Sequence, residues 1–358
     1  MLSNSQLKHP KFAVWLSLLL TGLCIPITSH ADTLEAWRND IASTRLLVEN
    51  DVPRALNEAQ RLQANIPPYA TPVDKARVLN LLSRAESQSA LTEQAAQHSK
   101  LAFEQASQNG DKVGQVEADL NVAWNAVNQS RIDEVAAAAV HAMTTLEGID
   151  RPDLLAEAML RTSMTYRRIG QLDESTTMTM RQMEIAKRSL SPRVLMFALQ
   201  GLAISYDQSG DKKKALEYFL LMLEQARAIP SKLFEAEALI GVGEAEMQQG
   251  DVEKGEKKIR EAIALNRVVG APFQIAHAVF SLGFQFHAHH RDAEALSLFN
   301  ETVGIFERYN NMIGLWWSLN ARSEILQASG HLAQAQADAE RSYALAKKIK
   351  LAIYAGSH

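Results

Sequence analysis

Histidine provides the sequence with its most concentrated set of groups that can do chemistry. His287, His289 and His290 lie two and three positions apart, and His277 precedes them by ten residues. Imidazoles at this spacing near the end of a helix can share a transition metal. The same run, however, falls at an expected turn between two helices, where histidine is usually solvated. We therefore favour a surface turn over a metal site and expect no cofactor.

Signatures of the common enzyme classes are missing from the sequence. It has no Gly-x-Ser-x-Gly nucleophile motif, no Gly-Lys-Ser or Gly-Lys-Thr phosphate loop, and no His-Glu-x-x-His metal motif. The segment 241–246 resembles the start of a dinucleotide-binding loop, but it falls inside an expected helix and follows no strand. The sequence therefore favours a protein without catalytic activity.

A repeat of 40 residues dominates the chain. Small residues recur in one register, and turn positions follow them seven residues later. Eight matches in step, without an insertion, indicate stacked copies of one supersecondary unit and therefore a solenoid. The small positions are Ser43, Ser83, Ala123, Ser163, Ala203, Gly243, Gly283 and Ser323. The turn positions are Asn50, Ala90, Ser130, Gly170, Gly210, Gly250, His290 and Gly330.

Each unit is expected to consist of two antiparallel helices joined by a tight turn. In the fifth unit, Leu195, Leu199 and Leu202 recur at the spacing of one buried helical stripe. A glycine at the turn can adopt the left-handed conformation that ends the first helix. Prolines mark several expected helix starts, where a missing N–H is harmless. These prolines, each 18 residues before a turn position, are Pro72, Pro152, Pro192 and Pro272, with Thr71 and Ser191 as expected N-caps.

The fifth unit resembles the tetratricopeptide repeats. Ala203, Tyr206, Gly210, Ala215 and Phe219 match that family's small, aromatic, turn, small and large apolar positions. The resemblance covers residues 32 to about 350 and implies an all-α, right-handed superhelical solenoid of eight antiparallel hairpins. The period of 40 exceeds the family's typical value of about 34 and resembles the extended repeats of bacterial signalling proteins. HEAT or armadillo repeats fit the period but do not explain the paired small residues.

In this family the first helix of each hairpin lines a concave groove that binds a protein or peptide segment. The resemblance places positions thirteen, ten, six and three residues before each turn in that groove. An exposed row of apolar side chains there would be a binding surface, although burial between the helices is an equally open alternative. Three arginines beside the row can receive a carboxylate or form a solvated basic face. The row comprises Leu120, Trp124, Leu160, Met164, Phe197, Ile204, Phe280, Phe284, His287 and Trp317, and the arginines are Arg161, Arg167 and Arg168.

Residues 1–31 have the layout of a secretory signal peptide. Lys8 and Lys11 precede an apolar stretch over 12–25, and 29–31 is a small-x-small cleavage site. Cleavage would remove the only cysteine, Cys24, and change the formal net charge from −4 to −6. We therefore expect a periplasmic or secreted protein without disulfides, thiolate catalysis or a membrane span, and an uncleaved anchor is the alternative. A mildly acidic chain without a basic stripe is a poor ligand for nucleic acid.

The C-terminal residues 351–358 begin what resembles a ninth repeat. The apolar stretch 351–355 has no second helix to cover it, so we expect either fraying or self-association through this end. Two functions remain open. The preferred one is a non-catalytic scaffold that binds a protein or peptide, and the alternative is the sensory region of a truncated membrane-bound signalling protein of the diguanylate cyclase or histidine kinase type.

Overall fold

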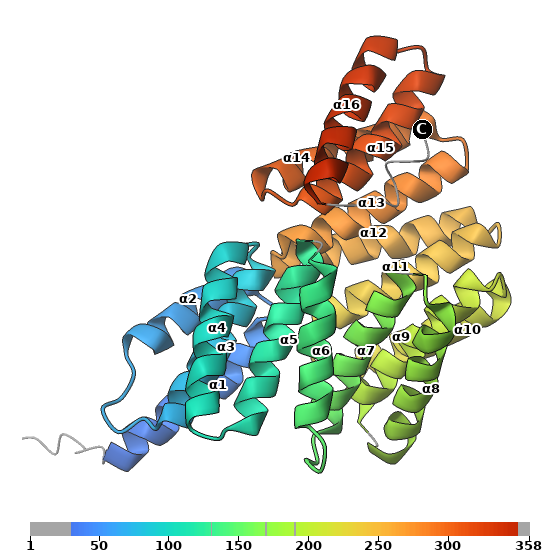
Figure 1. The fold of residues 1–358 in the computed structure, drawn as a ribbon. Helices are drawn as coiled ribbons and strands as arrows, with labels where there is room; N and C mark the ends of the chain where they lie inside the picture. Colours follow the sequence, from blue (N-terminus) through green and yellow to red (C-terminus); the bar gives the residue numbers. More distant parts are fainter. Residues whose placement is uncertain (1–29, 130, 169, 190, 350–358) are drawn as a thin grey trace, which may run out of the picture.

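The computed structural model describes residues 30–129, 131–168, 170–189 and 191–349, and these ranges contain helices without strands. Figure 1 shows the helices following one another along a curved array. The predicted signal peptide up to residue 29 and the predicted ninth repeat over 351–358 lie outside these ranges. The helices are α1 (His30–Leu47), α2 (Val52–Ala64), α3 (Pro72–Gln88), α4 (Thr92–Gln108), α5 (Lys112–Asn128), α6 (Ile132–Thr145), α7 (Pro152–Arg168), α8 (Leu172–Ser189), α9 (Pro192–Gln208), α10 (Lys212–Arg227), α11 (Lys232–Gln248), α12 (Val252–Val269), α13 (Pro272–Ala288), α14 (Asp292–Arg308), α15 (Met312–Ala328) and α16 (Leu332–Lys348).

The helices pair into eight hairpins, which confirms the expected solenoid. Each odd-numbered helix packs against the even-numbered helix that follows it, and most odd-numbered helices also contact the next odd-numbered one. Among the helix pairs of the described ranges that pack against each other more than marginally, none joins two even-numbered helices. The odd-numbered helices therefore form the inner layer of the curve, and the even-numbered helices form the outer layer.

The sequence signals at the helix starts have the expected structural roles. Each of the four prolines predicted at a helix start is the first residue of its helix. Thr71 caps α3 in a capping box, because its hydroxyl accepts from the Asp74 N–H and the Asp74 carboxylate accepts from the Thr71 N–H. Ser191 precedes α9 in extended conformation but makes no side-chain cap bond.

Left-handed residues end the first helix of most hairpins, as the turn register predicts, whereas Asn50 in the first hairpin is not left-handed. Gly210 and Gly250 have φ values of 84° and 97°. Ala90 and His290 occupy the same register position with φ values of 62° and 59°, although a side chain disfavours this conformation. The turn geometry is therefore imposed by the hairpin and not by glycine alone.

The paired small residues lie where the two helices of a hairpin cross. A Cβ atom built on Gly243 of α11 would lie 2.7 Å from the carbonyl oxygen of Gly255 in α12. At the equivalent crossing of the second hairpin, the Ser83 hydroxyl of α3 donates to the Ala95 carbonyl of α4 at 2.9 Å. Small side chains at this register therefore allow the two backbones to approach at the low end of helix-packing distances.

The turn after α1 contacts the middle of the chain and closes the curve. The guanidinium of Arg193 in α9 makes two bonds, at 2.8 and 3.0 Å, to the Glu49 carboxylate. The Asn50 side chain donates to the Pro230 carbonyl at 2.7 Å and accepts from the Lys232 N–H at 3.1 Å. We call these bonds the closure contact.

Apolar side chains reinforce the closure contact at two places. Val52, at the start of α2, forms a buried cluster with Leu233, Val269 and Ala271. In the second hairpin, the left-handed Ala90 packs with Phe273 and other buried residues around α13. The first two repeats thus cover one side of the space enclosed by the inner helices.

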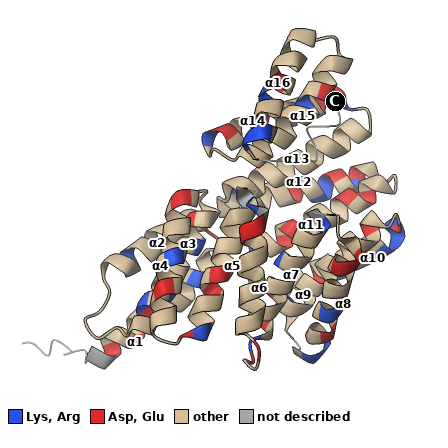
Figure 2. Ribbon diagram, in the orientation of Figure 1, with Lys and Arg blue, Asp and Glu red and all other residues tan. Residues whose placement is uncertain are grey.

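Charged residues are interspersed along most helices, with both signs present (Figure 2). No helix in the described ranges is long and apolar enough to cross a membrane.

Candidate binding site

The inner helices enclose a pocket of about 570 Å³. Residues from every odd-numbered helix from α3 to α15 line it, together with Glu49 from the turn after α1. This volume lies within the range of pockets that hold small-molecule and cofactor ligands. The curvature of the solenoid therefore creates a defined site and not only a shallow groove.

Aromatic and aliphatic side chains form most of the pocket wall. Phe284 of α13 and Trp317 of α15 remain 54% and 47% exposed, although both are large apolar residues. Trp316, its neighbour in the sequence, is buried. Exposed apolar side chains that converge on one cavity are typical of a binding site. The apolar lining residues are Trp124, Val127, Leu160, Met164, Met196, Phe197, Leu233, Phe234, Phe273, Phe280, Phe284, Phe306, Ile313 and Trp317.

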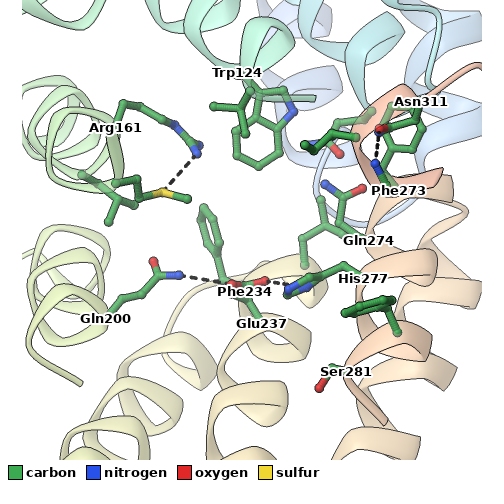
Figure 3. A pocket seen from close by; sticks show the side chains of 18 of the residues that line it. Trp124, Arg161, Gln200, Phe234, Glu237, Phe273, Gln274, His277, Ser281 and Asn311 are labelled. Carbon is green, nitrogen blue, oxygen red and sulfur yellow. Dashed lines mark hydrogen bonds and ion pairs between the residues drawn. The ribbon is translucent and has the colours of Figure 1, made fainter. Parts of the chain in front are cut away.

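A cation–aromatic cluster occupies one side of the pocket (Figure 3). The guanidinium of Arg161 stacks on the ring of Trp124 at 4.1 Å, and Arg84 approaches the same ring at 5.0 Å. Glu157 lies between the two arginines, 3.0 Å from Arg84 and 3.7 Å from Arg161. Only 7% of the Arg161 side chain is exposed. Burial lowers the pKa of Arg161 to about 10, so the group stays charged at neutral pH.

Two carboxylates occupy the α11 side of the pocket. Glu237 accepts a hydrogen bond from the Gln200 amide at 3.2 Å, and His277 lies 3.9 Å from its other oxygen. Glu244 accepts from the Ser281 hydroxyl at 2.6 Å. Burial raises the pKa of Glu244, and the hydrogen bond from Ser281 and the charge of His277 oppose this effect only in part.

Several polar atoms at the pocket wall have no hydrogen-bond partner among the described residues. They are two donors, the Trp124 indole nitrogen and the Arg161 Nε, and two acceptors, the Oε1 atoms of Gln88 and Gln274. Gln88 and Arg161 are only 4% and 6% exposed. Buried polar groups are normally paired, so these atoms indicate where a ligand can complete the network.

The structure brings many residues of the predicted groove into the pocket wall. These are Trp124, Leu160, Arg161, Met164, Phe197, Phe280, Phe284 and Trp317.

The remaining predicted groove residues lie elsewhere. Leu120 is buried and borders a separate pocket of about 250 Å³, and Ile204 packs against the central core cluster. Arg167 is partly buried near the end of α7, and the side chain of Arg168 lies outside the described part. His287 bonds through Nδ1 to the Asp292 carboxylate at 2.7 Å, and no metal-binding group of three candidate ligands occurs in the described ranges.

Several pocket residues were not predicted, because the predicted row consists mainly of apolar side chains. Glu237 and Glu244 occupy the groove register of the sixth repeat, thirteen and six residues before Gly250. His277 has the equivalent place in the seventh repeat. Applying the register to polar side chains as well would have found all three. Phe234 and Gln274 lie sixteen residues before their turns, outside the register.

No protein-family model and no curated protein matches the sequence. Solved structures do share the fold. A Rap protein complexed with competence and sporulation factor is 15% identical, with a TM-score of 0.56 over 90% of this chain and 98% of that one. Cut9–Hcn1 of the APC/C is 13% identical, with a TM-score of 0.60 over 90% of this chain and 55% of that one.

A third structure, from Pyrococcus horikoshii, is described as a signal-transduction ATPase with numerous domains and a tetratricopeptide repeat sensor. It is 13% identical, with a TM-score of 0.51 over 82% of this chain and 48% of that one. The chain has the tetratricopeptide-repeat fold. In this tetratricopeptide-repeat solenoid the pocket lies on the concave face, because the first helices of repeats two to eight supply most of its wall, with Glu49 from the turn after α1 and Phe306 from α14.

Proposed function

We propose that this protein is a non-catalytic scaffold that binds a peptide or protein segment in the concave pocket. The enclosed pocket carries the proposal, because exposed aromatic residues and unpartnered polar atoms from separate repeats converge on it. Such a combination of apolar area and few polar groups is typical of ligand sites. The Rap structure, which shares the fold and is described as complexed with competence and sporulation factor, supports a binding role.

Removing the exposed aromatic side chains should abolish capture of a peptide while leaving the fold intact. The double variant Phe284→Ser and Trp317→Ser truncates two large side chains that are about half exposed, so its melting temperature should change little. A synthetic peptide library, incubated with the protein and analysed by affinity selection and mass spectrometry, provides the measurement.

Leu332→Ser is the matched control for this experiment. Leu332 is 66% exposed on α16 and does not line the pocket. The control should retain the peptides that the wild type retains, whereas the double variant should lose them. Equal retention by the double variant, or no retained peptide with any of the three proteins, would contradict the proposed function.

We also propose export, so that the scaffold acts in the periplasm or outside the cell. The order of basic, apolar and small residues in 1–31 supports this proposal. Protein recovered from the periplasm of a bacterial host should have the intact mass of a chain that begins at Asp32. A membrane-bound product that retains Met1 would show an uncleaved anchor instead.

The sensory region of a larger signalling protein is the second candidate. The Pyrococcus horikoshii structure, described as having a tetratricopeptide repeat sensor, favours it. In this case the pocket would bind the signal, and an effector encoded after His358 would respond to it. The coding sequence beyond that codon distinguishes the two candidates.

A further inference from the structure

We propose that the pocket binds a short peptide with two free ends, its carboxylate at Arg161 and its ammonium group at Glu237 and Glu244. This inference rests on the proposed function and names the class of ligand.

The Arg161 side of the pocket carries one positive charge in excess. Arg193 is matched by Glu49 through two bonds, whereas Arg84 and Arg161 share only Glu157. Glu157 lies closer to Arg84, so Arg161 is the less compensated of the two. The unpartnered Arg161 Nε and Trp124 indole nitrogen are both donors. A carboxylate accepts from a guanidinium and an indole N–H, and such charge-assisted bonds are stronger than neutral ones.

The α11 side of the pocket has the opposite charge. Glu237 and Glu244 line it together with His277, which lies 3.9 Å from Glu237, whereas the lining arginines, Arg84 and Arg161, belong to the other side. Glu244 is held by a neutral donor, the Ser281 hydroxyl, and Glu237 receives its bond from the neutral Gln200 amide. An ammonium group would supply the missing positive charge, and it can donate three hydrogen bonds to these acceptors.

The two sides face each other across the cavity. Figure 3 places Arg161 and Trp124 on one side and Gln200, Glu237 and His277 on the other, with the Phe234 ring between them. Burial lowers the pKa of Arg161, and the charges of Glu157 and, to a smaller extent, Glu237 counteract this effect, although no bond joins Arg161 and Glu237 in the described structure. The space between them can therefore hold a ligand whose ends carry opposite charges.

The size of the cavity limits the length of the peptide. A volume of about 570 Å³ accommodates a drug-sized ligand, which corresponds to roughly two to four amino-acid residues. The closure contact covers one side of the cavity, so a segment inside a folded partner would have difficulty reaching both charged groups. The aromatic wall favours apolar side chains between the two ends.

Capping the ends of the peptide tests the inference on the wild-type protein. The probes are four synthetic libraries of all tripeptides built from Ala, Leu, Phe, Trp and Asn: uncapped, N-acetylated, C-amidated and doubly capped. Affinity selection should retain uncapped tripeptides, and either cap should weaken binding by about tenfold or more, the effect of losing one charge-assisted contact. A fifth library of longer, doubly capped peptides tests binding that needs no free ends.

Protein variants assign each end to its side of the pocket. Glu237→Gln should reduce the difference in binding between uncapped and N-acetylated tripeptides, with Glu244 still present, and Arg161→Gln should reduce the difference between uncapped and amidated ones. Melting curves show whether each variant is folded. If Arg161→Gln does not fold, Trp124→Phe replaces it in the test, because this variant removes the indole donor and keeps an aromatic ring.

The outcomes separate this inference from the proposed function. Equal binding of capped and uncapped tripeptides, or retention of the longer capped peptides only, would overturn the inference and leave the scaffold function standing. Retention of no peptide from any library would overturn both. Loss of binding on capping that persists unchanged in both variants would refute the assignment to Arg161 and Glu237.

Discussion

Replacing Glu157 with glutamine is expected to lower the free energy of unfolding by about 3–5 kcal/mol, the usual effect of removing one partner of a buried ion pair. Glu157 is 13% exposed and compensates Arg84 and Arg161, of which Arg161 is almost completely buried. The glutamine has nearly the same shape, so the loss arises from charge and not from a cavity. Denaturant unfolding at pH 7 measures it.

The partly exposed Glu58 provides the control, because its partner Arg61 also pairs with the exposed side chain of Asp40. Glu58→Gln should change stability by less than about 1 kcal/mol. Burial alone would raise the pKa of Glu157, but the charges of Arg84 and Arg161 outweigh it and hold the pKa below its ordinary value. The stabilisation is therefore complete above the unfolded-state pKa of about 4.3 and is lost as the pH falls through the folded-state pKa. A difference between wild type and Glu157→Gln that stays constant down to low pH would contradict this explanation.

Two glycine-to-alanine substitutions should shift stability in opposite directions. A Cβ atom on Gly255 would overlap the Gly243 carbonyl oxygen and lie 2.9 Å from the Met247 backbone nitrogen. Overpacking against the backbone should cost about 3 kcal/mol, the upper end of its usual range. Alanine recovers about 1 kcal/mol through helix propensity, which leaves a net loss of about 2 kcal/mol.

Gly304, inside α14, is the matched position. A Cβ atom there would meet nothing within 4 Å, so Gly304→Ala should gain about 0.5–1 kcal/mol from helix propensity alone. Thermal unfolding of both variants, under identical conditions, provides the comparison. Shifts of the same sign would show that the hairpin crossing does not require its small residues.

The repeat made most of the fold predictable. The interval of 40 residues places the small positions, the turns and the helix-starting prolines in one register, and the hairpins follow it. The reason is local, since each of these features acts within one hairpin or between neighbouring ones. The closure contact was not predictable, because Glu49 and Arg193 are 144 residues apart and lie in different repeats at unrelated register positions.

The candidate site was accessible from the sequence only in part. The groove register located Trp124, Phe280 and Phe284, since it depends on helix geometry alone. The register did not show that Leu120 is buried beside a different pocket, because burial depends on how far successive repeats rotate. The register also did not show that Arg161 and Glu237 lie on opposite sides of one pocket, because this placement depends on how the array curves.

The closure contact also has a consequence for how the chain folds. Helix hairpins form from contacts between near neighbours and can assemble one after another in any order. The Asn50–Lys232 bond, by contrast, joins residues 182 positions apart, so it can form only when the intervening hairpins are already in place. Contacts of such high sequence separation slow folding because the chain between them must be ordered first. We therefore expect closure of the curve to be a late step of folding and an early step of unfolding, and we expect a ligand held in the cavity to act on this step.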